Sequence, residues 1–75
     1  MKDHESRLTE EDRGRVAARA REKALEGFDL MTCTRVALHA IGCTALDLRD
    51  VELAEVEVIV GKEHSRATRE RALRP

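Results

Sequence analysis

The stretch VELAEVEVIV, residues 51–60, decides the expected fold. Five of its ten residues are β-branched, and Val56, Val58 and Val60 alternate with other residues in the period-two pattern that is typical of a strand. Leu53 is out of phase with the later valines, so either a bulge near Ala54 or a late start of the strand is required. We therefore predict a strand over residues 51–60, ended by Gly61.

This strand has no partner in the chain, because no second segment has a comparable content of β-branched residues. A lone strand leaves its backbone N–H and C=O groups unpaired. We therefore expect the strand to be completed by another protein chain or by a second copy of this one. The interface residues predicted on this basis are Leu53, Val56, Val58 and Val60.

Two helices are expected before the strand. The first begins at Thr9, which forms a capping box with Asp12, and it ends at Gly27. Its apolar residues at helical spacing are Val16, Ala17, Ala20 and Ala24. Because alanine buries little area, this helix needs another surface to lie against.

The second helix begins at Asp29, where Phe28 can pack back on Cys33, and it ends near Gly42. Apolar or small residues spread over more than half of its circumference: Leu30, Cys33, Ala37, Leu38, Ala40, Ile41 and Thr44. This breadth predicts that the second helix is the centre of the core.

The expected fold is therefore α+β: a small single domain of two helices and a strand, followed by a short polar helix over residues 66–73 that Ser65 caps. We expect residues 1–8 to be disordered, residues 9–61 to form the α+β domain, and residues 62–75 to be a basic tail, partly helical or disordered. The 75-residue chain has 19 large apolar side chains (Leu, Ile, Val, Phe and Met), so a single thin core is all that it can build.

Charge is segregated along the chain although its net value is only −1. Residues 1–12 and 47–60 are acidic, whereas residues 13–27 and 61–75 are basic. Such blocks suit self-association, because an acidic block on one copy can meet a basic block on another; mixing of both signs on a solvated surface is the alternative. The acidic start lacks the basic, apolar character of a signal peptide and no stretch is long and apolar enough to span a bilayer, so we expect no membrane association and a cytoplasmic location.

Cysteine and histidine offer little chemistry. Cys33 and Cys43 lie ten residues apart, too far for a disulfide within one helix, and fit a reducing compartment. His39 and Cys43 have the spacing of two zinc ligands on one helix face, but further ligands are missing nearby, so no metal is predicted. A triad of Cys43, His39 and Asp47 has only its residue types in its favour. We expect no cofactor, no catalytic residue and no enzymatic activity.

Nucleic acid is the alternative partner. Basic residues are concentrated in the first helix and in the tail. The candidates for phosphate contact are Arg15, Arg19, Lys23, Arg66 and Arg69. A chain with one aromatic residue cannot build the stacking platforms of single-strand readers, and interleaved glutamates favour surface ion pairs.

The sequence thus predicts a small non-enzymatic interaction or assembly module, acting as a homodimer or as a subunit of a larger complex. The alternative is a small nucleic-acid-associated or regulatory protein that uses the basic first helix and the C-terminal tail.

Overall fold

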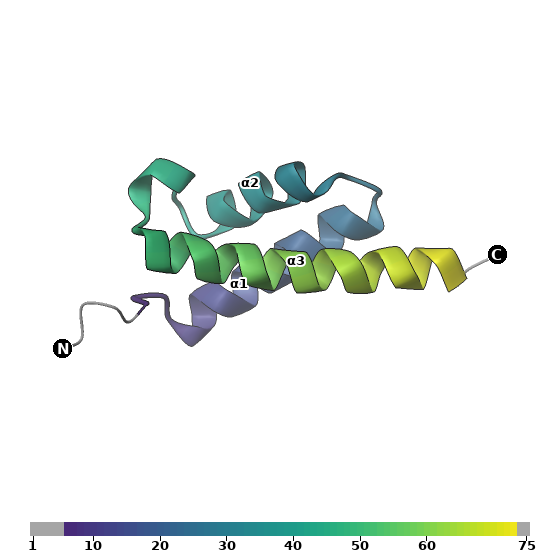
Figure 1. Cartoon of the computed structure of the whole chain (residues 1–75), viewed down its shortest axis with the longest axis horizontal. Helices are drawn as coiled ribbons and strands as arrows, with labels where there is room; N and C mark the ends of the chain where they lie inside the picture. The colour runs from purple at the N-terminus through teal and green to yellow at the C-terminus, as the bar shows by residue number, and fades with distance from the viewer. Residues whose placement is uncertain (1–5, 74–75) are drawn as a thin grey trace.

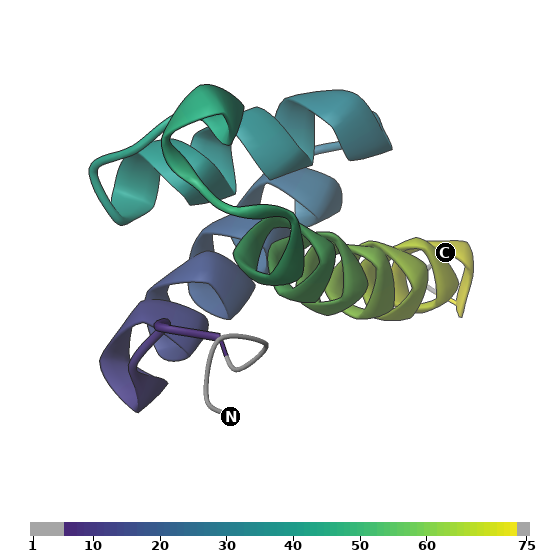
Figure 2. The same cartoon turned by 60° about the vertical axis from the view of Figure 1, so that its left-hand side comes forward.

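The computed structural model describes residues 6–73, which fold as three helices and one short 3₁₀ turn (Figure 1). The elements are α1 (Glu10–Leu25), α2 (Leu30–Ala40), the turn η1 (Ala45–Asp47) and α3 (Asp50–Leu73). Helices α1 and α3 run in the same general direction and cross, while α2 runs back over them (Figures 1 and 2).

Local signals set the ends of α1 as predicted. The Thr9 hydroxyl accepts a hydrogen bond from the Asp12 amide at 3.0 Å, and the Asp12 carboxylate accepts one from the Thr9 amide at 3.2 Å, so the capping box is confirmed. After the helix, Gly27 has a φ of +99°, and the Phe28 amide donates back to the Lys23 carbonyl at 3.1 Å. This is a Schellman end, which needs the left-handed conformation that glycine adopts without strain.

The ends of α2 are confirmed in the same way. The Asp29 carboxylate caps the helix by accepting from the Thr32 amide at 2.9 Å. Gly42 has a φ of +75°, and the Cys43 amide donates to the Leu38 carbonyl at 3.1 Å in a second Schellman end.

The core lies where α1 meets the other two helices. Its buried apolar residues are Leu8, Val16, Ala20, Ala24, Cys33, Ala37, Leu38, Val56, Val60 and Ala67. Helix α1 packs closely against both α2 and α3, whereas α2 and α3 touch each other least. The prediction that the second helix is the centre was therefore wrong: the small side chains of α1 let both neighbours approach it, and α1 is the central element.

The predicted α+β fold is also wrong, because residues 51–60 are the first half of α3 and the described residues contain no strand. In a helix, Glu52, Val56 and Val60 recur every four residues on one face, and all three are buried. A helix also satisfies its backbone groups within one segment, which a lone strand cannot do. The strand prediction placed Val58 on the same face as Val56 and Val60. In the helix it lies on another face, and 56% of its surface is exposed.

Helix α3 continues without a break through Gly61 to Leu73. The predicted short helix capped by Ser65 is therefore wrong, and the boundary drawn after residue 61 matches no feature of the backbone. At the other end, Leu8 is buried in the core, while residues 1–5 of the segment expected to be disordered lie outside the described residues. None of the helices within residues 6–73 has the length and apolar character that crossing a bilayer requires.

The segregated charges meet within the chain. Arg13 of α1 donates to Glu55 of α3 at 2.5 Å, and Arg21 forms a two-pronged pair with Glu70 at 2.7 and 2.8 Å. These pairs link the basic block of residues 13–27 to carboxylates spread along α3, so they fix the register of two helices that run in the same direction. The Arg13–Glu55 pair joins a basic block to an acidic block within the chain, whereas Glu70 belongs to the basic block of residues 61–75.

We expect Gly61→Ala to raise the free energy of unfolding by about 0.5–1 kcal/mol, because Gly61 sits inside α3 and open space surrounds the position of a new Cβ. The matched variant Gly42→Ala also meets open space but should lower the free energy of unfolding by about 1–2 kcal/mol, since φ there is +75°. Urea unfolding followed by circular dichroism measures both. A Gly61→Ala variant that is no more stable than wild type would contradict a continuous α3.

Candidate functional site

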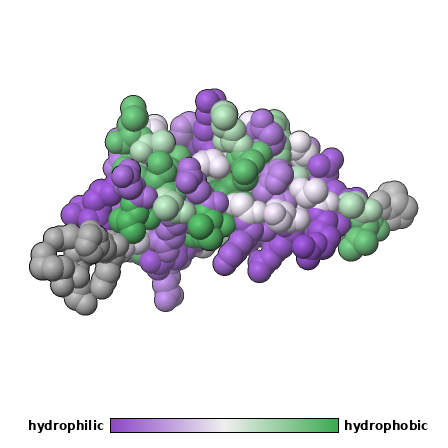
Figure 3. All heavy atoms as spheres, viewed as in Figure 1, coloured by the Kyte–Doolittle hydropathy of each residue, from purple (hydrophilic) through white to green (hydrophobic). Residues whose placement is uncertain are grey.

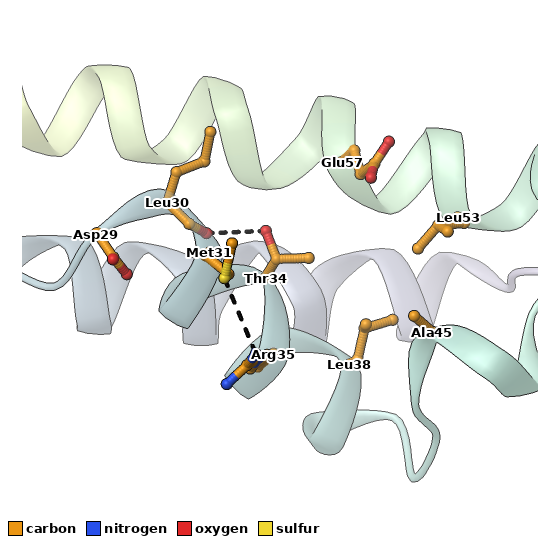
Figure 4. Close-up of a pocket in the computed structure, with 9 residues that line it drawn as sticks. All are labelled: Asp29, Leu30, Met31, Thr34, Arg35, Leu38, Ala45, Leu53 and Glu57. Carbon is orange, nitrogen blue, oxygen red and sulfur yellow. Dashed lines mark hydrogen bonds between the residues drawn. The ribbon is translucent and has the colours of Figure 1, made fainter.

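An apolar groove lies between α2 and α3, where the two helices diverge from their common support on α1 (Figure 4). Its volume is about 810 Å³. The residues that line it are Asp29, Leu30, Met31, Thr34, Arg35, Leu38, Ala45, Leu53 and Glu57. Leucine and methionine side chains make up most of its surface, with charged groups at the edges.

The first turn of α2 carries large apolar side chains that border this groove and are not buried in the core. Leu30 is 48% exposed and Met31 is 65% exposed, although both lie in the first turn of a well-capped helix. Phe28, just before the helix, is 44% exposed, and the Lys23 ammonium lies 5.4 Å from its ring centre. In Figure 3 hydrophobic residues gather over α2 and the first half of α3.

A second hollow, of about 500 Å³, continues the groove toward η1. It shares Arg35, Leu38 and Ala45 with the first and adds Leu46 at its edge. The Leu46 side chain is 96% exposed, so it contributes almost nothing to this fold. The two hollows and Leu46 therefore form one continuous surface, which we call the α2–α3 groove.

Charges of both signs stand at the edges of this groove. Arg35, exposed on α2, has its Nη2 atom 3.9 Å from the Met31 sulfur, and Glu57 is exposed on α3. At one end, hydrogen bonds from Thr32 lower the pKa of the Asp29 carboxyl, with a smaller contribution from Arg35. The groove is thus apolar along its floor and charged on both walls.

A buried carboxylate holds the start of α3 in place below the groove. Glu52 is only 3% exposed; Arg49 donates to both of its oxygens, at 2.9 and 2.6 Å, and the Arg7 backbone N–H donates at 2.9 Å. The hydrogen bonds from Arg49 lower the pKa of Glu52 to about 2, against the opposing effect of burial. This contact ties the segment before α1 to α3 and so sets the position of Leu53, one wall of the groove.

The residues that were considered for a catalytic triad or a metal pair, but not predicted as either, do come together in a small hollow of about 190 Å³ lined by His39, Gly42, Cys43, Thr44 and Asp47. Their hydrogen bonds go elsewhere, however. The Cys43 thiol donates to the Leu38 carbonyl at 3.7 Å, and Asp47 accepts from the amide and hydroxyl of Thr44 at 2.8 and 3.1 Å. The thiol is thus hydrogen-bonded to a backbone carbonyl and the carboxylate to Thr44, rather than to each other.

Burial raises the pKa of the Cys43 thiol, which is the reverse of what a nucleophilic cysteine requires. Cys33 is fully buried, its pKa is also raised by burial, and both cysteines are free. Within the described part of the chain, no three His, Cys, Asp or Glu side chains are placed to share a metal ion.

The residues predicted to contact phosphate are mostly paired with carboxylates of their own helix. Arg15 pairs with Glu11, Arg19 with Glu22, Lys23 with Glu26, and Arg66 with Glu63, while Arg69 is exposed on α3. Arg15 and Arg19 are each two residues from Arg13 and Arg21, and two residues turn a helix by about 200°. Because Arg13 and Arg21 face α3, the cations Arg15 and Arg19 point away from those of α3 and build no common surface with them.

The predicted interface residues are separated by the fold. Val56 and Val60 are fully buried in the core, Val58 is exposed away from it, and only Leu53 lines the groove. Sequence reasoning missed Met31, Leu46 and Glu57 as site residues. The sequence feature that could have identified Met31 and Leu46 is that both are large apolar residues outside the apolar faces of the predicted helices.

No family model matches the chain, and no significant match was found among curated proteins or among solved structures. The α2–α3 groove is therefore the feature of the chain that bears on its function.

We expect Glu52→Gln to lower the free energy of unfolding at pH 7, because the variant loses the charge that Arg49 pairs with. The pKa of Glu52 is about 2 in the folded chain and 4.5 ordinarily, so wild type keeps this stabilisation above pH 4.5 and loses it as the pH falls toward 2. Denaturant unfolding of both proteins over this pH range is the measurement. The two stabilities should converge at the acid end, and a constant gap would show that the Glu52 charge is not what the fold depends on.

Proposed function

We propose that this chain is a small non-enzymatic interaction module that binds a protein chain in the α2–α3 groove, as a homodimer or as a subunit of a larger complex. The observation that carries the proposal is the exposure of Leu30, Met31 and Leu46 around an apolar groove. Large apolar residues gathered on one surface, with charges around them, are the usual anatomy of a protein–protein interface.

The shape of the groove favours a protein partner over a small molecule. A small-molecule site encloses its ligand and directs several polar groups inward. Here leucine side chains line the groove, and Met31 and Leu46 project outward from the surface. Side chains that project can enter a partner's surface, as interface anchors do.

The nucleic-acid alternative remains a prediction with less support. Four of the five candidate cations are engaged with glutamates of their own helix, so phosphate would have to compete with these pairs. We also propose a cytoplasmic location, because the two free cysteines suit a reducing compartment.

A photo-activated cross-linking residue at position 31 should capture a discrete protein partner in cells, while the same residue at position 58 should not. Val58 is the matched control because it is exposed on α3 but outside the groove. The captured protein, identified by mass, should bind purified chain, with affinity about tenfold lower or worse for Met31→Glu and unchanged for Val58→Glu. Equal capture at both positions, or capture at neither, would contradict the proposal.

A further inference from the structure

We propose that the occupant of the α2–α3 groove is a second copy of this chain, bound about a two-fold axis through the middle of the groove, with Leu46 of each copy seated at the Leu30–Met31 end of the other. This inference rests on the proposed function and names its partner. A two-fold interface uses the same surface on both copies, so that surface must hold both the projecting groups and the hollows that receive them.

The α2–α3 groove meets this requirement along its length. Leu46 projects at the η1 end and is 96% exposed, while Leu30 and Met31 lie at the opposite end, where α2 begins. Figure 4 shows Leu30 at one end of the groove and Ala45 and Leu53 at the other. A two-fold rotation about the centre exchanges the two ends, so it carries Leu46 of each copy onto the other's Leu30 and Met31.

The groove is self-complementary across its width as well. Arg35 stands on the α2 wall beside Met31, toward one end of the groove, and Glu57 stands on the α3 wall on the side nearer Leu53 (Figure 4). The same rotation places the α2 wall of one copy over the α3 wall of the other, so each Arg35 faces the partner's Glu57. Two opposite-charge pairs then flank the apolar contact, and they add specificity and register to it.

The charge of Arg35 is available for this role. Its guanidinium makes a weak contact with the Met31 sulfur, whereas Arg13, Arg21 and Arg49 are held by carboxylates of their own chain. A partner's carboxylate at Arg35 therefore displaces no ion pair of the fold.

Sedimentation velocity of the purified full chain over a range of concentrations tests the proposal. We expect a reversible species of twice the 8.5 kDa chain mass, with a dissociation constant on the order of micromolar, as for small interfaces. Leu46→Asp should weaken this association about tenfold or more. Leu73→Asp is the matched control, an exposed leucine (79%) at the far end of α3, and should leave it unchanged.

A charge exchange tests the two-fold arrangement itself. Arg35→Glu and Glu57→Arg should each be monomeric alone, because each homodimer would hold two like-charge contacts. Mixing the two variants should restore a dimer containing one chain of each, since both opposite-charge pairs are then re-formed. All these side chains are exposed, and circular dichroism melting should confirm that every variant is folded.

A wild-type chain that stays monomeric at millimolar concentration, an unaltered dimer in Leu46→Asp, or a mixture that remains monomeric would each overturn the inference. Its failure is distinguishable from that of the proposed function. A monomeric chain that still cross-links a different protein from position 31 keeps the groove as a binding site with another occupant, whereas no cross-link at position 31 removes both.

Discussion

The close contact between the small-residue face of α1 and the valine ridge of α3 is the constraint on which the rest of the structure depends. Val16, Ala20 and Ala24 of α1 share one buried cluster with Val56, Val60 and Ala67 of α3, and because most of these side chains are small the two helices can pack closely. Because α2 also packs mainly on the same central helix, α2 and α3 contact each other less than either contacts α1. The groove is the space that this arrangement leaves open.

Ion pairs reinforce the contact between α1 and α3 and set the register of the two helices. A helix pair joined only by alanine and valine could slide along its axis, since small residues make a smooth surface. Arg13 with Glu55 and Arg21 with Glu70 bind the two helices at both ends, and Glu52 anchors the segment before α1. Electrostatics here supplies register rather than the main driving force, which remains burial of the apolar face.

The ends of α1 and α2 can be predicted from the sequence, whereas the helical state of residues 51–60 cannot. Thr9, Asp29, Gly27 and Gly42 marked the helix ends correctly, because capping depends on a few neighbouring atoms. Residues 51–60 were misread because Val56 and Val60 belong to two periodicities at once: with Val58 they suggest a strand, and with Glu52 they form a helix face. β-propensity is weak against the need to satisfy every backbone group, and the sequence offers no second segment with a comparable content of β-branched residues to pair with 51–60.

The groove was beyond prediction for a related reason: its walls come from helices whose angle the sequence does not reveal. Leu30 was placed on the apolar face of its helix, yet the divergence of α2 from α3 leaves it half exposed. Leu46 and Met31 do not lie on the apolar face of any predicted helix, so the sequence pattern assigns them no role. Large apolar residues that remain exposed outside such a face are the ones that a partner can cover.

The central claim is that residues 50–73 form one helix packed on α1, and the most direct measurement is the set of backbone Cα chemical shifts of the chain by NMR. The account predicts helical shifts without interruption from Asp50 to Leu73, together with nuclear Overhauser contacts between the valine methyls of α3 and the alanine methyls of α1. Extended-chain shifts over residues 51–60, or helical shifts that stop at Gly61, would contradict it.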